Sequence, residues 1–121
     1  MRLKHAQEVE ARAVAAGADT TIQVLISSQE GPNFALRRFT MQPGGGMPRH
    51  TNTVEHEQYV LAGEATVTVG DETYCVEPGD VLFIPEGVVH SYENTGRVPF
   101  QFLCIIPNKE DRLTLVSGEA C

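Results

Sequence analysis

Three histidines and one asparagine, from two well-separated stretches, are the residues whose types and spacing could support chemistry. His50 and Asn52 are two residues apart. His56 opens the next apolar run, and His90 follows far along the chain. Because side chains two apart on a strand share a face, we expect His50 and Asn52 to lie together. Imidazole and amide groups gathered from three strands could bind one metal ion, and imidazole suits zinc, iron, copper and nickel.

Short β-strands are the elements that must position these residues. Runs of β-branched and aromatic residues alternate with Gly, Pro, Asn and Asp throughout most of the chain. An alanine-rich stretch at 11–18 is expected to form a short helix, and the glycine-rich stretch 43–48 a flexible loop. Many short strands with little helix predict an antiparallel sandwich or barrel. Strands are expected at 21–27, 33–41, 56–62, 65–69, 73–76, 81–84, 88–92 and 98–106.

Length and charge limit the kind of protein. With 121 residues, of which 41% are hydrophobic, we expect a single domain with one modest core. A net charge of −7 argues against nucleic acid as a partner and against docking on an anionic membrane. The three cysteines, Cys75, Cys104 and Cys121, are widely spaced and form no Cys-x-x-Cys pair. Reduced thiols and the absence of an N-terminal apolar run predict a cytoplasmic location.

The stretch around His90 resembles the second motif of the cupin superfamily, G-x5-P-x-G-x2-H-x3-N. The chain has every fixed residue of that motif at the right spacing, with Gly79, Pro85, Gly87, His90 and Asn94. Five fixed residues at fixed offsets make this a fairly specific signal. The chain therefore resembles a small single-domain bacterial cupin of the conserved-barrel (cupin 2) type.

The stretch around His50 resembles the first cupin motif, G-x5-H-x-H-x3-4-E-x6-G, with two departures. Gly44, His50 and Gly63 fit the motif. Asn52 stands where the second histidine is expected, and His56 stands where the glutamate is expected. A histidine in place of glutamate keeps a ligand of suitable reach, whereas an amide either binds the metal weakly or hydrogen-bonds a metal-bound water.

The resemblance implies an all-β fold, an antiparallel jelly-roll β-barrel with one metal ion in its mouth. Residues 1–121 would form a single domain, with the conserved barrel at about 33–107 and peripheral segments at 1–20 and 108–121. Zinc, iron or nickel is the expected metal, and manganese or copper would also suit the family. Small cupins usually pair, and the strand at 98–106 is apolar on both faces, so a homodimer is expected. The implied metal ligands are His50, Asn52, His56 and His90.

Four further residues are candidates for a role beside the metal. Tyr92 shares a face with His90, and Gln58 shares the inward face of its strand with His56. Arg37 and its neighbour face opposite sides of a strand, and Arg37 is the one expected to point inward and bind an anion. Glu55 is a candidate base, although a solvated surface position is the simpler interpretation.

These features support more than one function. Three neutral imidazoles and an amide leave the full charge of a divalent ion, so an anionic ligand is expected. The first hypothesis is a metal-dependent enzyme of isomerase, decarboxylase or dioxygenase type, acting on a small oxygen-rich anion. The second is a module that binds or senses a small molecule without turnover. The third, a metal-free sugar-type epimerase, agrees poorly with the histidine cluster.

Overall fold

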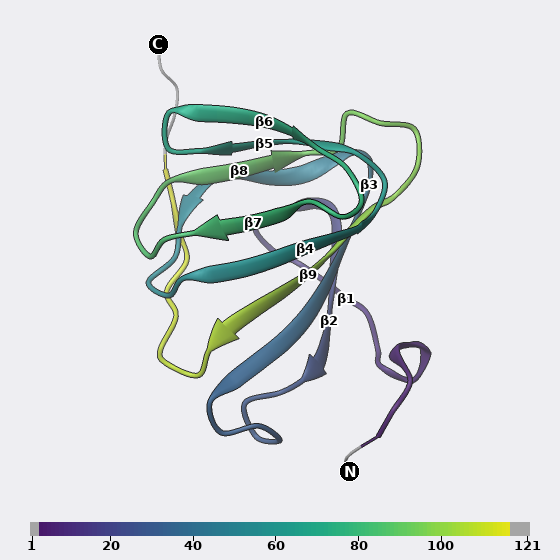
Figure 1. Ribbon diagram of the computed structural model, residues 1–121, viewed down its shortest axis with the longest axis vertical. Coiled ribbons are helices and arrows are strands. Elements are labelled where there is room, and N and C mark those ends of the chain that lie inside the picture. Colours follow the sequence, from purple (N-terminus) through teal and green to yellow (C-terminus); the bar gives the residue numbers. More distant parts are fainter. Residues whose placement is uncertain (1–2, 117–121) are drawn as a thin grey trace.

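The computed structural model describes residues 3–116 and consists almost entirely of β-strands (Figure 1). Within that range the single helix is a short 3-10 turn, η1 (Ala6–Glu8). The strands join in one curled antiparallel sheet, which confirms the predicted all-β fold. They are β1 (Arg12–Ala13), β2 (Ala18–Ile26), β3 (Phe34–Thr51), β4 (His56–Ala62), β5 (Ala65–Val69), β6 (Glu72–Val76), β7 (Val81–Ile84), β8 (His90–Glu93), β9 (Phe100–Pro107) and β10 (Thr114–Leu115).

Strand β3 links the two walls of the barrel. Its first half pairs with β9, from Phe34 opposite Pro107 to Met41 opposite Phe100. Its second half pairs with β8, where His50 lies opposite His90. The order β6-β5-β8-β3-β9-β4-β7 therefore bends at β3, and Figure 1 shows the outer strands folding back toward each other across an interior. The 18-residue strand β3 thus belongs to both walls, and the predicted site residue His50 lies in its second half.

The glycine-rich stretch 43–48 lies inside β3, so the prediction of a flexible loop was wrong. Gly45 and Gly46 are buried, and Gly46 pairs with Glu93 on β8. A Cβ atom on Gly46 would collide with the carbonyl oxygen of Tyr92. Gly46 therefore allows β3 and β8 to approach closely, which is a known use of glycine within strands.

The helix predicted at 11–18 is also absent from the structure. Arg12 and Ala13 form β1 and pair with Ile22 and Thr21 of β2. Pairing with a neighbouring strand overrides the helix propensity of alanine here. No helix within residues 3–116 is long and apolar enough to cross a membrane.

The core lies between the two walls and is organised around β9. Phe100, Phe102 and Cys104 alternate along β9 and are fully or almost fully buried. Ile105, next to the buried Cys104, is 40% exposed, so in the single chain β9 is not covered on both faces as predicted. The motif residue Asn94 has a structural role, because its buried amide donates to the carbonyl oxygens of Met41 and Val98.

Candidate functional site

The structure brings the four predicted metal ligands together at one end of the barrel. His50 and His90 face each other across the β3–β8 pair, with ring centres 4.1 Å apart. His56 begins β4, and its ring centre lies 5.7 Å from that of His90. Asn52 follows β3 directly. All four side chains are buried, with at most 6% of their surface exposed.

Backbone carbonyl groups determine which nitrogen of each ring faces the interior. The Nδ1 of His50 lies 2.7 Å from the carbonyl oxygen of Pro48, and the Nδ1 of His90 lies 2.9 Å from that of Val88. A carbonyl oxygen only accepts hydrogen bonds, so each Nδ1 carries the proton. The Nε2 lone pairs of His50 and His90 are thereby left free of protons. This is the tautomer in which a histidine can bind a metal through Nε2.

Among the four predicted ligands, three buried polar atoms have no hydrogen-bond partner within residues 3–116. They are Nε2 of His56, Nε2 of His90 and Oδ1 of Asn52. Buried polar atoms are nearly always paired, so three unpaired polar atoms in one place need an explanation. Imidazole nitrogens and amide oxygens are both atoms that can coordinate a divalent transition metal.

Burial keeps the three imidazoles neutral. Burial, together with the smaller effect of the nearby Arg37 cation, lowers the pKa of His56 to about 3. The pKa of His90 falls to about 4, chiefly through burial, against which its hydrogen bond to Val88 acts in the opposite direction. Burial also lowers the pKa of His50. Because a metal binds the neutral ring, the three histidines are in the protonation state for metal binding at neutral pH.

The donor set fits a transition metal chemically, but the side chains do not form a finished metal cage. Across residues 3–116, no group of three or more His, Cys, Asp or Glu side chains is arranged to hold a metal ion. The ligand role of the histidines and of Asn52 therefore stays a prediction, supported by their burial, tautomers and unpaired atoms.

A pocket of about 210 Å³ opens beside the histidines. Its lining includes three of the four additional candidates, Arg37, Gln58 and Tyr92, and does not include Glu55, which is exposed. The remaining wall is mostly apolar, formed by Val14, Ile22, Phe39, Met47, Phe102 and Leu113. The pocket is therefore polar at the histidine end and apolar over much of the rest.

Arg37 is a cation held in this lining without an acidic partner. Its Nη2 donates to the Sγ of Cys104 at 3.1 Å, and its guanidinium carbon lies 5.1 Å from the centre of the Phe39 ring. Its Nε is buried and unpaired, and no carboxylate within residues 3–116 forms an ion pair with it. A guanidinium presented in this way is suited to bind a carboxylate or enolate oxygen.

Tyr92 and Gln58 form a buried pair beside the histidines. The Nε2 of Gln58 donates to the Tyr92 hydroxyl at 2.7 Å, and Oε1 of Gln58 has no partner within residues 3–116. Burial raises the pKa of Tyr92, so its hydroxyl keeps its proton at neutral pH. Because the hydroxyl oxygen accepts from Gln58, that proton is available to a ligand.

Two polar residues of the site had no recognised role in the sequence. Cys104 packs in the core, but its Sγ also lies 3.4 Å from the Nδ1 of His56. Asp111 lies at the pocket mouth, and both its carboxylate oxygens face the amide nitrogen of Asn52, at 3.3 and 3.4 Å. Asp111 is 59 residues from Asn52, in a polar tail with no motif, so no sequence pattern linked the two.

The buried histidines lead to a prediction about acid stability. Below about pH 6.5 the unfolded chain takes up protons on these rings, whereas folded His56 and His90 do so only near pH 3 and 4. The unfolded state then binds more protons, so the free energy of unfolding of the metal-free protein should fall as pH drops from 6.5 to 4. Each such histidine contributes up to about 1.4 kcal/mol per pH unit. Urea unfolding at a series of pH values measures this slope.

Glu57 requires a control in that experiment. A hydrogen bond with the carboxyl group of Glu55 raises its pKa to about 7, which lowers stability as pH rises and so opposes the histidine effect. The Glu57→Gln variant removes this contribution. In the Glu57→Gln background, adding His56→Gln should reduce the change in the free energy of unfolding per pH unit between pH 4 and 6.5. An unchanged slope would show that buried His56 is not the source.

Comparison with known proteins agrees with the fold and the motifs. The family model for the cupin domain matches residues 37–106. The polyketide cyclase RemF of Streptomyces resistomycificus is 31% identical, with a TM-score of 0.85 and coverage of 97% of this chain and 87% of RemF. A cupin-2 domain protein of Rhodospirillum rubrum is 26% identical at the same TM-score, covering 95% of this chain and 80% of that protein.

Curated relatives match over a shorter region. A mannose-1-phosphate guanylyltransferase of Klebsiella pneumoniae is 39% identical over 74 residues, which are 60% of this chain but 16% of that enzyme. The chain thus corresponds to about one sixth of the length of this relative. The family model and the fold together show that the chain belongs to the cupin domain family.

Proposed function

We propose that the protein binds one divalent transition metal through His50, Asn52, His56 and His90. Zinc, iron or nickel is expected, and manganese or copper would also suit these donors. The observation that carries this proposal is the set of unpaired buried atoms, Nε2 of two imidazoles and Oδ1 of the amide, beside one pocket. Backbone contacts that fix the tautomers of His50 and His90 support it.

The proposed activity is a metal-dependent reaction on a small, oxygen-rich anion that carries a carbonyl group. A bound divalent metal would supply Lewis-acid polarisation of a carbonyl or carboxylate oxygen. Because the donors are neutral, they would leave the positive charge of the site uncompensated, and this favours an anionic substrate. Arg37 would bind a second oxygen of the same substrate, and the Tyr92 hydroxyl would donate a hydrogen bond to it.

The apolar wall narrows the substrate class. Phe39, Phe102, Met47 and Leu113 would bury the carbon skeleton of a substrate and exclude water around it. A substrate with several carbonyl groups on an apolar or aromatic carbon skeleton would be complementary to both the polar and the apolar part of the pocket. The likeness to a polyketide cyclase over nearly the whole chain supports this class, since polyketides carry repeated carbonyl groups.

Binding without turnover is the alternative, and one observation favours it. Isomerisation or cyclisation of a carbonyl compound requires a base, and Glu55 lies outside the pocket lining. Within residues 3–116, the one carboxylate that lines the pocket is Asp111, at its mouth. Under this alternative, the metal and Arg37 hold an anionic ligand that leaves the protein unchanged.

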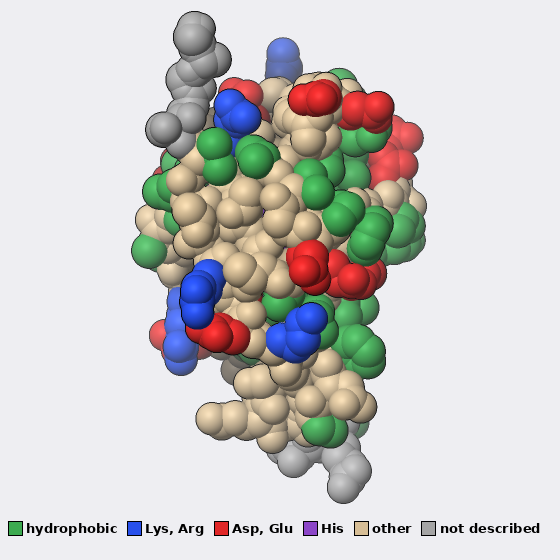
Figure 2. Space-filling view, turned by 90° about the vertical axis from the view of Figure 1, so that its left-hand side faces the viewer, with side chains coloured by type: hydrophobic (Ala, Val, Ile, Leu, Met, Phe, Trp, Pro, Cys, Tyr) green, Lys and Arg blue, Asp and Glu red, His purple; other side chains and the backbone are tan. Residues whose placement is uncertain are grey.

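We also propose that the protein is a homodimer that pairs through the outer face of β4, β7 and β9. Neighbouring positions on these strands expose apolar side chains: Tyr59, Leu61, Val81, Phe83 and Ile105 are 38–73% exposed. Figure 2 shows apolar side chains gathered along one side of the molecule. Glu57 lies on the same face, opposite Phe83 and Ile105. An exposed face that is mostly apolar is typical of a protein interface, and a second copy would cover β9 as its composition predicted.

Metal content tests the central proposal. Untagged protein should contain close to one metal ion per chain by elemental mass spectrometry. The His50→Ala, His90→Ala double variant should retain less than about a tenth of it, because losing two imidazoles removes most of the binding energy. The matched control is His5→Ala, since His5 is an exposed histidine far from the site. No metal in the parent, even after incubation with zinc, iron and nickel, would disprove the metal centre.

The role of Arg37 is tested by ligand binding. Acetoacetate is a suitable probe because it combines a carbonyl group with a carboxylate. Its affinity for the metal-loaded protein should fall about 10-fold or more in Arg37→Met, since a charge-assisted hydrogen bond is lost. Arg38→Met is the matched control, because Arg38 belongs to the same strand and instead bonds Gln23 at 2.9 Å. Equal losses in the two variants would argue against an anion site at Arg37.

The dimer is tested by light scattering coupled to gel filtration at micromolar concentration. The parent should elute with twice the mass of one chain. Phe83→Glu places a charge on the exposed apolar face and should give a monomer, whereas Leu3→Glu, also at an exposed position, should not. A monomeric parent would contradict the proposal.

A further inference from the structure

We infer that Asp111 is a positioning residue that holds the Asn52 amide with its oxygen directed toward the proposed metal. This inference rests on the proposed metal centre and adds a residue that lies outside both histidine motifs. It also assigns Asn52 the role of a direct ligand through Oδ1.

The chemistry of the two side chains determines the orientation of the amide. The Nδ2 of Asn52 lies 3.3 and 3.4 Å from the two carboxylate oxygens of Asp111. An ionised carboxylate only accepts hydrogen bonds, so it must face the NH₂ end of an amide and not the oxygen. Asp111 thereby turns Oδ1 of Asn52 to the opposite side, where it is buried and unpaired.

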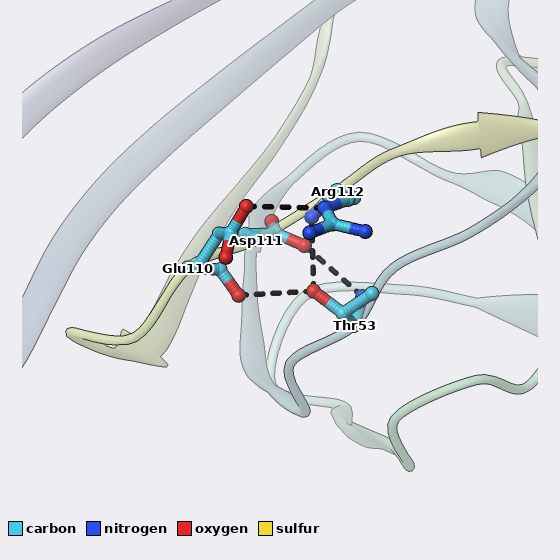
Figure 3. Close-up of polar contacts among 4 residues, drawn as sticks. All are labelled: Thr53, Glu110, Asp111 and Arg112. Atoms are coloured by element: carbon cyan, nitrogen blue, oxygen red, sulfur yellow. Dashed lines mark hydrogen bonds and ion pairs between the residues drawn. The ribbon is translucent and has the colours of Figure 1, made fainter.

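Contacts with Thr53 hold the Asp111 side chain and the residues next to it in place. Its Oδ1 accepts the backbone N–H of Thr53 at 3.1 Å. The Thr53 hydroxyl donates to the carbonyl oxygen of Glu110 at 3.0 Å and accepts the backbone N–H of Arg112 at 2.9 Å. Figure 3 shows these contacts around Thr53. The segment therefore docks beside Asn52 through residues on both sides of Asp111.

Further contacts anchor the segment independently of the Asp111 side chain. Leu115 of β10 pairs with His50 of β3, and the backbone N–H of Val116 donates to the carbonyl oxygen of Arg49 at 2.9 Å. These are backbone contacts, and the substitution Asp111→Ala does not touch them. Truncation of the carboxylate should thus free the Asn52 amide while the segment remains docked.

A freed amide can present either end to the metal. Its NH₂ end carries partial positive charge and is not a ligand, so the population with oxygen directed inward falls. Loss of a group that orients a ligand typically weakens metal binding about 10- to 100-fold. Zinc affinity should therefore fall about 10-fold in Asp111→Ala, with little change in the unfolding midpoint of the metal-free protein.

A double-mutant cycle on zinc affinity tests whether Asp111 acts through Asn52. The four proteins are the parent, Asp111→Ala, Asn52→Ala and the double variant, titrated with zinc against a chelating dye. Asp111→Ala should weaken binding clearly in the parent background and much less once Asn52 is alanine, where only the charge of Asp111 beside the pocket is lost. An equal loss in both backgrounds would overturn the inference, because Asp111 would then act directly or through the charge of the site.

Glu110→Ala is the matched control for charge. It removes one carboxylate from the same segment, and its side chain contacts Arg112 rather than Asn52. Its zinc affinity should stay within about twofold of the parent, as expected for an exposed charge. If Asp111→Ala failed to fold, Asp111→Asn would replace it. That variant keeps an acceptor for Thr53 but offers an amide that can meet either end of Asn52, so zinc binding should again weaken.

A readout without metal separates this inference from the proposed metal centre. In the metal-free protein, the side-chain NH₂ resonances of Asn52 should show slow exchange with water that becomes faster in Asp111→Ala but not in Glu110→Ala. Absence of zinc binding with this difference intact would reject the metal centre and, with it, the ligand role of Asn52. Zinc binding by the parent without any difference between the two variants would reject the positioning role alone.

Discussion

Two backbone carbonyl groups, those of Pro48 and Val88, determine what the site can do. Each accepts a hydrogen bond from the Nδ1 of the histidine two residues later. The free Nε2 of each ring is then presented away from its own strand, and the β3–β8 register places the two rings against each other. Leaving a buried polar atom unpaired costs about 1–3 kcal/mol, so an arrangement that leaves several unpaired is expected at a binding site rather than in an ordinary core.

The division of the pocket into a polar and an apolar part follows from the same strands. On β4, His56 and Gln58 point inward, as do Tyr92 on β8 and Phe102 on β9. The strand period of two thus places charged, polar and aromatic groups on one inner surface. Arg37 lines the same pocket, where its guanidinium donates a hydrogen bond to Cys104 and lies over the Phe39 ring. A ligand bound to Arg37 as proposed would also lie against the apolar wall.

The relatives show how little the fold says about the reaction. Similar structures include a polyketide cyclase and, at 23% identity with a TM-score of 0.78, a predicted oxalate decarboxylase of Thermotoga maritima. At that lower identity the likeness shows the fold alone. The same barrel supports different chemistry because the walls and the mouth, rather than the strand order, contact the substrate. In this chain, residues near both ends contribute to those parts, with Val14 on one side and Asp111 and Leu113 on the other.

The sequence by itself determined most of the strands and the grouping of the histidines, but not β1, β10 or the second half of β3. Strands β4, β5 and β7 occupy the predicted ranges, because each is bounded by turn residues and alternates in side-chain direction. Motif spacing indicated that His50, His56 and His90 belong to one site, and the structure places them beside one pocket. Only the tertiary structure decided that the stretch 43–48 continues a strand, since Gly46 is packed against Tyr92 and Glu93 and Gly45 against Ala18 and Asp19. It also decided the tautomers of the rings and the orientation of the Asn52 amide. These depend on individual hydrogen bonds, which produce no periodic pattern in the sequence. Asp111 is also 59 residues away from Asn52, so no local motif joins the two.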